Sequence, residues 1–418
     1  MGKKAVVLSG GGARGAYQAG AWKALRELDY QFDIVTGTSV GALNAAMMAS
    51  GDFERAITLW QEISPEAVLK NSPETSSEEI GIGKWTLEFM EKAIRERSFD
   101  QTPLRALIEK NLDLDALYAS PVELGIVATK HPSMETVRLY KNEIPKERMI
   151  DYLMASSACY PLMRAYKIGE ESYIDGGFGD NMPTQMAIDA GAEEIVVINL
   201  DAIGVKAKSN RAGIRVTRVD PKEDLGFILD FNRNYALVNI ERGYFDTMKA
   251  FSIYDGWLYN FKKGEMTGAN EAFIALLEDA AAKAIPENNM GGFMKKHIAM
   301  NFIRVMAKGT SAITLGKGWV LSAADLTGRI FALDPQKVYT KAEFDRLLLQ
   351  KLAALPHFDT KNGEDILRVL TDDALKTKYL YLQLRELFSG NSVPKALIFA
   401  ADAAPKALLC AFYLLSIT

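Results

Sequence analysis

Two glycine-rich turns decide the fold of this chain: AVVLSGGGARGAYQAG at residues 5–20 and FDIVTGTSVGALNAA at residues 32–46. Each turn follows a short apolar run typical of a buried β-strand and precedes a run with apolar residues at helical spacing. We predict strands at Lys4–Leu8 and Phe32–Thr36. We predict helices at Ala16–Leu28 and Val40–Ser50. Strands that alternate with helices in this way predict an α/β fold with a parallel sheet.

The alternation continues to about residue 250. Further strands are predicted at residues 122–129, 136–140, 195–200 and 214–219, and a long helix at Asp224–Phe251. From about Gly264 the chain reads as helical segments. We therefore expect one domain at residues 1–260 and a second, mainly helical domain at residues 261–418.

Composition excludes several classes of protein. The chain has 49 Lys and Arg against 53 Asp and Glu, a net charge of −4, so it lacks the overall basic bias typical of nucleic-acid binding. Cys159 and Cys410 are the only cysteines, which excludes a disulfide framework and a multi-cysteine zinc site. Only three histidines occur. We expect no metal, no cofactor and no nucleic-acid partner.

The first turn is a glycine loop between a strand and a helix. Such a loop brings backbone N–H groups close to a ligand, and a helix N-terminus favours negative charge. The spacing also fits a dinucleotide fingerprint, which expects an acidic residue at the end of the next strand. Asp33 precedes the apolar residues Ile34-Val35 of that strand and does not follow them, so the pattern favours an oxyanion hole. The loop residues are Gly10, Gly11, Gly12, Ala13, Arg14 and Gly15.

The second turn has the pattern of a nucleophile elbow. Its sequence is Gly37-Thr38-Ser39-Val40-Gly41, directly between a predicted strand and a predicted helix. A sharp turn needs small residues on both sides of the nucleophile, and Ser39 would stand exposed at the helix N-terminus. The alternative is an ordinary glycine-rich turn in which Ser39 only caps the helix.

A third short motif, Asp175-Gly176-Gly177, follows a run with β character at residues 171–174. On its own, an Asp-Gly pair is typical of a hairpin turn. Beside the other two motifs it indicates an aspartate that projects from a strand end into a shared cleft.

Together, the three motifs resemble the patatin-like phospholipases in order and spacing. Shorter stretches at residues 98–104, 156–161 and 181–183 are also similar to that family, and the resemblance covers about residues 4–250. It implies a three-layer α/β sandwich with a central, mostly parallel sheet. The helical C-terminal extension lies outside it.

The resemblance also implies a Ser–Asp dyad acting on acyl esters of lipids. Ser39 would be the nucleophile and Asp175 the base, and N–H groups around Gly11 and Gly12 would form the oxyanion hole. Arg14 would stabilise a phosphate head group or the oxyanion loop, or simply lie on the surface. An exposed aspartate is a weak base at neutral pH, so the dyad requires burial of Asp175.

Two other readings stay open. One is an α/β-hydrolase with a Ser–Asp–His triad, for which His297 or His357 would supply the base. The other is a non-catalytic membrane-binding scaffold in which the C-terminal helices carry the function.

The helical stretch at residues 52–121 is a candidate cap over the cleft. Six of its apolar side chains are candidates for an acyl channel or for core packing: Leu59, Trp60, Ile63, Trp85, Leu87 and Phe89.

We expect a cytoplasmic protein without a signal peptide or transmembrane helix, because the apolar runs at residues 5–8 and 407–418 are too short. The second run predicts a buried or capping helix, or an interfacial contact. Peripheral contact with a membrane would then rely on apolar residues or a local basic patch.

Overall fold

The computed structural model describes residues 2–70, 91, 98–283, 318–359, 361–390, 397, 400 and 403–418. The chain divides into two compact units, Met1–Phe251 and Ser252–Thr418. Four residues named above lie outside the described ones: Trp85, Leu87, Phe89 and His297. Among the described residues, no helix combines the length and the hydrophobicity needed to cross a bilayer.

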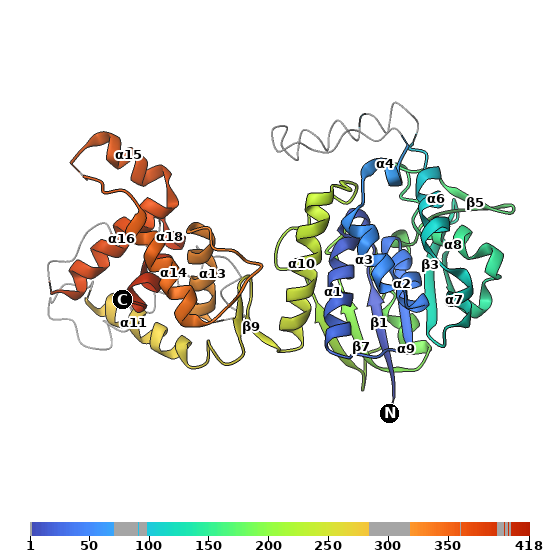
Figure 1. Cartoon of the computed structure of the whole chain (residues 1–418), viewed down its shortest axis with the longest axis horizontal. Helices are drawn as coiled ribbons and strands as arrows, with labels where there is room; N and C mark the ends of the chain where they lie inside the picture. The colour runs from blue at the N-terminus through green and yellow to red at the C-terminus, as the bar shows by residue number, and fades with distance from the viewer. Residues whose placement is uncertain are drawn as a thin grey trace. The chain divides into compact units, whose positions relative to one another are not determined.

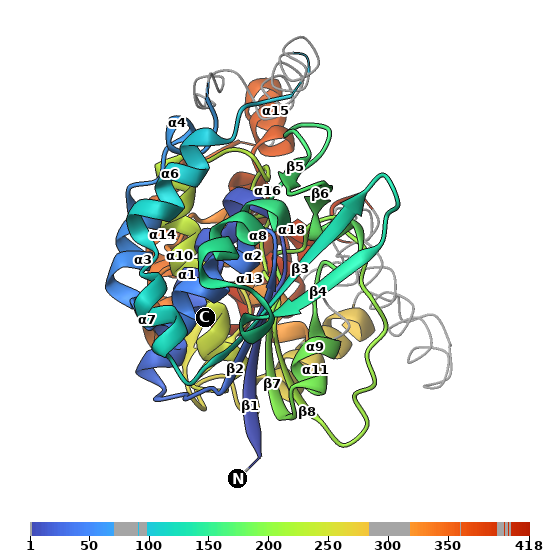
Figure 2. The same ribbon diagram turned by 90° about the vertical axis from the view of Figure 1, so that its right-hand side faces the viewer.

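The first unit is built around an eight-stranded sheet (Figures 1 and 2). Its strands are β1 (Lys3–Leu8), β2 (Ile34–Thr38), β3 (Glu123–His131), β4 (Thr136–Tyr140), β5 (Tyr166–Ile168), β6 (Glu171–Asp175), β7 (Ala192–Ile198) and β8 (Arg215–Val219). The order is β5-β6-β3-β2-β1-β7-β8, with β4 also paired to β3. Strands β3, β2, β1, β7 and β8 run parallel, and β4 and β6 run antiparallel to β3. The predicted α/β fold with a mostly parallel sheet is confirmed.

Helices cover both faces of this sheet. They are α1 (Ala16–Glu27), α2 (Val40–Ser50), α3 (Phe53–Gln61), α4 (Pro65–Val68), α6 (Thr102–Asn111), α7 (Leu114–Ala119), α8 (Met149–Ser156), α9 (Thr184–Asp189) and α10 (Arg233–Ala250). Short 3-10 turns occupy Gly12–Gly15, Lys141–Glu143, Lys146–Arg148 and Gly176–Phe178.

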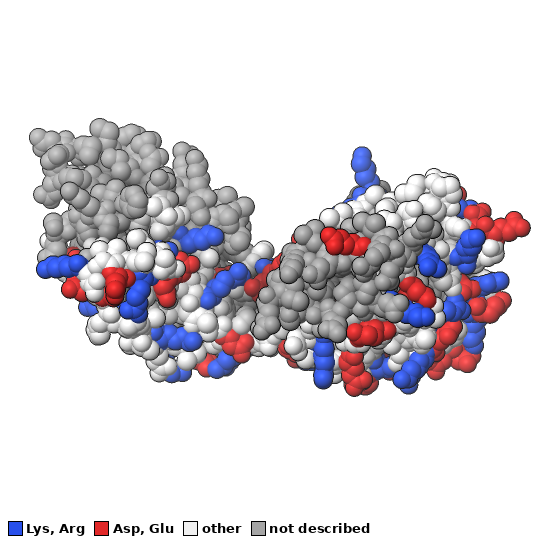
Figure 3. Space-filling view, turned by 90° about the horizontal axis from the view of Figure 1, so that it is seen from above, with Lys and Arg blue, Asp and Glu red and all other residues white. Residues whose placement is uncertain are grey.

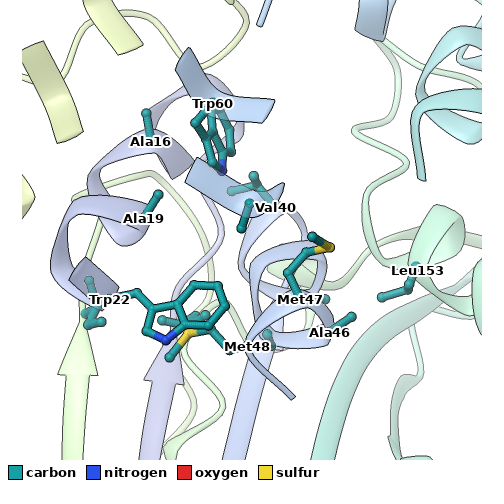
Figure 4. Close-up of a cluster of buried hydrophobic side chains, with 14 of the residues drawn as sticks. Ala16, Ala19, Trp22, Val40, Ala46, Met47, Met48, Trp60 and Leu153 are labelled. Atoms are coloured by element: carbon teal, nitrogen blue, oxygen red, sulfur yellow. The ribbon is translucent and has the colours of Figure 1, made fainter. Parts of the chain in front are cut away.

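The side chains of β1 point alternately to the two faces of the sheet, and each face is covered by helices, which gives three layers. Val6 and Leu8 pack into the core beneath α1, α2 and α10, whereas Ala5 and Val7 pack into a second core beneath α9. Successive side chains of a strand point to opposite faces, so a strand that is apolar throughout must be covered on both. Figure 4 shows part of the larger core, where Ala16, Val40 and Trp60 lie close together.

The predicted helix at Asp224–Phe251 is shorter than expected, because α10 begins only at Arg233. Two features keep the helix from beginning before Arg233. Gly226 has a φ of +88°, which belongs to a turn. Asn232 then caps α10, its side chain accepting a hydrogen bond from the N–H of Asn234 at 2.8 Å. The segment before Arg233 is therefore not helical, and it packs against the glycine loop.

The second unit contains a small sheet in the order β11-β10-β9, with β9 at Tyr254–Gly256, β10 at Asn260–Lys262 and β11 at Val338–Tyr339. Its helices are α11 (Ala269–Lys283), α13 (Trp319–Ile330), α14 (Lys341–Ala354), α15 (Gly363–Thr371), α16 (Asp373–Phe388) and α18 (Pro405–Ser416). Helix α18 carries the apolar C-terminal run, and Ala407–Leu414 is buried in this unit's own core.

Candidate active site

The central strand β3 brings Ser39 and Asp175 together. β4 takes one edge of β3 over residues 125–129, so β2 and β6 must share the other edge. β2 ends with Thr38 opposite Val127, and β6 arrives from the opposite direction and ends with Asp175 opposite Ala128. The two strand ends therefore meet at adjacent positions of β3.

Ser39 stands on a strained turn between β2 and α2. Its φ of 57° and ψ of −130° lie in a region that non-glycine residues rarely adopt. A Cβ on Gly37 would lie 2.2 Å from the Gly41 oxygen, and one on Gly41 would lie 2.5 Å from the Leu8 oxygen. Both glycines of the motif are thus required by close backbone contacts. The N–H of Ser39 donates to Ser156 Oγ at 2.9 Å, which helps to hold the turn.

The hydroxyl of Ser39 donates directly to Asp175. Its Oγ lies 2.6 Å from Asp175 Oδ2, and the N–H of Gly177 donates to Oδ1 at 2.8 Å. Burial raises the pKa of Asp175 to about 6, although the bonds from Ser39 and Gly177 act in the other direction. Asp175 is only 8% exposed. The carboxylate therefore has a pKa much closer to neutral pH than an exposed aspartate has.

The glycine loop lies against Ser39. A Cβ on Gly10 would approach Ser39 Cβ to 3.1 Å. Three amides of the loop donate to backbone carbonyls: Gly10 to Asn181 at 3.1 Å, Ala13 to Ile228 at 2.7 Å and Arg14 to Gly11 at 3.2 Å.

The amides of Gly11 and Gly12, in the middle of the loop, differ from these three. Within the described part of the chain, the N–H groups of Gly11 and Gly12 donate to no protein acceptor. Gly12 has a φ of +56°, and a Cβ there would lie 1.9 Å from the Ile228 oxygen. Gly11 and Gly12 line the same cavity as Ser39, so their two N–H groups are candidate donors at the site.

Arg14 points into the protein and not toward the cavity. Its guanidinium donates to the carbonyls of Gly226 at 2.8 Å, Leu200 at 3.1 Å and Asp201 at 2.8 Å. The side chain is only 18% exposed, and Asp224 lies 3.7 Å away. Arg14 ties the glycine loop to two neighbouring loops, which differs from both a head-group ligand and a surface arginine.

The other predicted site residues have packing roles. A Cβ on Gly15 would lie 2.5 Å from Val40 Cγ2, so Gly15 lets α1 and α2 approach each other. Thr38 is buried and donates to the Asp180 carbonyl at 2.7 Å. A Cβ on Gly176 would lie 2.3 Å from the Val127 oxygen, so only glycine fits behind Asp175.

Ser39 and Asp175 open onto an apolar cavity of about 470 Å³. α2 lines it with Val40, Leu43, Asn44 and Met47. Further lining comes from α3, α6 and the segments near them, including three of the predicted channel residues, Leu59, Trp60 and Ile63. The volume and the apolar lining are typical of a small-molecule or lipid-chain site. None of the described residues that line the cavity is a histidine.

Sequence reasoning gave no role to two groups that position the site. Ser156 supports the elbow, and its only signal was membership in a stretch that resembles the family. The carbonyl of Ile228 holds the glycine loop, and a main-chain group of this kind leaves no signal in the residue type.

The alternative readings fit the geometry less well. Asp33 precedes β2 and accepts a hydrogen bond from the N–H of Lys4 at 2.9 Å, so it lies at the sheet end opposite the glycine loop and cannot hold a ribose there. His357 is exposed and belongs to the second unit. Among the described residues, no group of three or more His, Cys, Asp or Glu side chains is placed to hold a metal ion.

Several known proteins are similar to this chain. VipD from Legionella pneumophila aligns with this chain at 14% identity and a TM-score of 0.37, covering 100% of this chain and 91% of VipD. The neuropathy target esterase sws of Drosophila melanogaster is 27% identical over 47% of this chain and 13% of the relative. A cUMP-AMP-activated phospholipase of Escherichia coli is 25% identical over 50% of this chain and 65% of the relative.

The matched part is less than two thirds of each of these two curated relatives. The family model for patatin-like phospholipases matches residues 6–188, a range that contains the glycine loop, the elbow and the Asp-Gly-Gly turn. Residues 6–188 of this chain therefore belong to the patatin-like phospholipase family.

Proposed function

We propose that this protein hydrolyses fatty acyl esters of lipids through an acyl-serine intermediate. The observation that carries the proposal is the 2.6 Å hydrogen bond from Ser39 Oγ to Asp175 Oδ2 at the wall of an apolar cavity. The family match supports it, and so does the similarity to an esterase and to a phospholipase.

The reaction has two steps. Asp175 accepts the proton of Ser39 as Oγ attacks the ester carbonyl, and the resulting oxyanion accepts hydrogen bonds from the amides of Gly11 and Gly12. Collapse of this intermediate breaks the ester bond, and the departing alcohol takes the proton from Asp175. Water then attacks the acyl-serine with Asp175 again as base, which releases the fatty acid and restores Ser39.

Hydrolysis of phospholipid vesicles tests the proposal. We expect the wild type to release free fatty acid, measured by mass spectrometry of the lipid products, and the Ser39→Ala variant to release none above background. Equal release by both proteins would contradict a role for Ser39.

The pH dependence of the reaction should follow Asp175. Only the ionised carboxylate can accept the proton, so activity should fall as pH drops through the folded-state pKa of about 6. We expect kcat/KM for p-nitrophenyl butyrate to be half-maximal near pH 6 and to fall about tenfold per pH unit below it. The His357→Ala variant should show the same acid limb. A limb near pH 4, or one that this variant abolishes, would contradict the assignment.

Acyl-chain length should be set along α2. Val40, Leu43 and Met47 line the cavity from one face of α2, because residues three or four positions apart in a helix lie on the same face. Met47 is seven positions after Val40 in the helix, so the far wall lies about 10 Å along the helix from the nucleophile.

The Met47→Trp variant would fill the far end of this cavity. We expect it to lower kcat/KM for a palmitoyl ester about tenfold or more, and for a butyryl ester less than twofold, because only the long chain reaches Met47. The control is Met134→Trp, since Met134 is 48% exposed and does not line the cavity. Equal losses on both esters would show that the cavity does not hold the acyl chain.

A further inference from the structure

We propose that the loop between β7 and β8, residues 201–213, docks the protein onto an anionic lipid surface. We call this segment the docking loop. The choice of a lipid surface as the partner rests on the proposed function. The position of the docking loop tells which face of the first unit would contact that surface.

The apolar tip of the docking loop is exposed at the rim of the cavity. Ile203 is 105% exposed and Val205 is 50% exposed, and Phe178 beside them is 42% exposed. All three also line the cavity that holds Ser39 and Asp175. Large apolar side chains that stay in water at the rim of an apolar site mark a surface that meets an apolar partner.

Basic residues follow this tip directly. Lys206, Lys208 and Arg211 are all exposed, and Asp201 is the only acidic residue of the loop. Within the described residues, neither Lys206 nor Lys208 forms an ion pair. Apolar residues beside exposed lysines are the combination that binds anionic membrane interfaces.

The neighbouring acidic groups do not cancel this charge. Asp180 is buried and pairs with Arg138 at 3.3 Å, and Asp224 lies 3.7 Å from Arg14. Over the face seen in Figure 3, basic and acidic side chains lie among one another, in line with the net charge of −4. Attraction to an anionic surface must therefore come from a local cluster of this kind.

Hydrogen bonds join the docking loop to both loops of the site, two of them between backbone groups and one from the Arg14 side chain. The N–H of Val205 donates to the Gly177 carbonyl at 2.9 Å, and its carbonyl accepts from the N–H of Asn181 at 2.6 Å. At the other end, Arg14 of the glycine loop donates to the Asp201 carbonyl. A lipid surface that binds the docking loop thus faces the cavity opening, and an acyl chain can pass from the bilayer to Ser39.

Vesicle binding in the Ser39→Ala background tests the proposal, because binding is then measured without hydrolysis. We compare Lys206→Glu/Lys208→Glu with Lys3→Glu/Lys167→Glu, which reverses two exposed lysines on β1 and β5. On phosphatidylcholine vesicles with 30% phosphatidylserine in 0.1 M salt, we expect the docking-loop pair to bind about 30-fold more weakly. The control pair should change binding less than threefold. Similar losses in the two pairs would overturn the proposal.

A dye on residue 203 tests insertion directly. Burial raises the pKa of both native thiols, Cys159 and Cys410, to about 12, so an exposed new cysteine reacts selectively at pH 7. We expect a polarity-sensitive dye on Ile203→Cys to shift to the blue with the anionic vesicles, and a dye on Leu367→Cys, on exposed α15, to stay unchanged.

The outcomes separate docking from catalysis. No blue shift at residue 203 would overturn the docking proposal even if the wild type hydrolyses esters. A wild type that hydrolyses no ester but binds through the docking loop would overturn the proposed function and support docking.

Discussion

Asp175→Asn is expected to lower kcat/KM for ester hydrolysis by at least about 10³-fold at pH 8. An amide keeps the shape of the carboxylate but cannot take the proton of Ser39. Among the described residues, the Asp175 carboxylate accepts hydrogen bonds only from Ser39 Oγ and the Gly177 amide, so the substitution leaves the surrounding packing in place. Steady-state kinetics on a soluble p-nitrophenyl ester measures the loss.

The same variant should be more stable than the wild type at pH 8. Burial raises the pKa of Asp175 from 3.8 to about 6, so the ionised form is disfavoured in the folded state by about 3 kcal/mol. This cost is absent below about pH 3.8, grows as pH rises to about 6 and is constant above it. We therefore expect Asp175→Asn to raise the free energy of unfolding at pH 8 and to lose that advantage near pH 4. Thermal or urea unfolding at both pH values measures the difference.

Asp246→Asn is the matched control for this pair of effects. Asp246 is also buried, at 6% exposure, but it pairs with Lys249 at 3.2 Å and accepts from Tyr17 OH. Its neutralisation removes the carboxylate charge that faces the buried Lys249 ammonium, so we expect lower stability and retained activity per folded molecule. An Asp175→Asn variant that lost stability and kept its activity would show a structural role only.

The second large effect is expected at Gly12→Ala. An added Cβ would lie 1.9 Å from the Ile228 oxygen, and the Gly12 amide is one of the two donors that we assign to the oxyanion. The loop must move to relieve this contact, and a displaced donor costs about 10²–10³-fold in kcat. We expect such a loss on soluble esters, together with reduced stability.

Gly169→Ala separates the clash from backbone strain. Gly169 has a φ of +64°, close to the +56° of Gly12, and no heavy atom lies within 4 Å of a Cβ built there. Both substitutions meet the same left-handed backbone cost of about 1–2 kcal/mol, but only Gly12→Ala displaces the loop. Equal activity in the two variants would remove the glycine loop from the mechanism.

The sequence predicted those parts of the site that depend on residue type. Gly37 and Gly41 were expected from the space needed around an elbow, and both make backbone approaches that exclude a Cβ. That Ser39 and Asp175 share a cleft was predicted from the three motifs together, but their pairing as a dyad was implied only by the family resemblance. It follows from β2 and β6 sharing one edge of β3, and a contact between two residues 136 positions apart cannot be derived from local pattern.

Other features depended on tertiary contacts that no local pattern reports. The apolar spacing before Arg233 suited a helix, but the backbone there bonds the glycine loop instead. Three roles were predicted for Arg14: a head-group ligand, a support of the oxyanion loop or a surface residue. The choice between them depends on distant carbonyls, which hold the side chain against two neighbouring loops. The burial that raises the pKa of Asp175 likewise arises only in the folded chain.

The most direct test of the Ser–Asp dyad is peptide mass spectrometry after reaction with a fluorophosphonate, which forms a covalent bond to an activated serine. We predict one adduct, on the peptide that contains Ser39. Its rate of formation at pH 8 should fall at least 100-fold in Asp175→Asn and stay unchanged in the His297→Ala/His357→Ala variant. An adduct on another residue, or a loss of labelling in the histidine variant, would contradict the dyad.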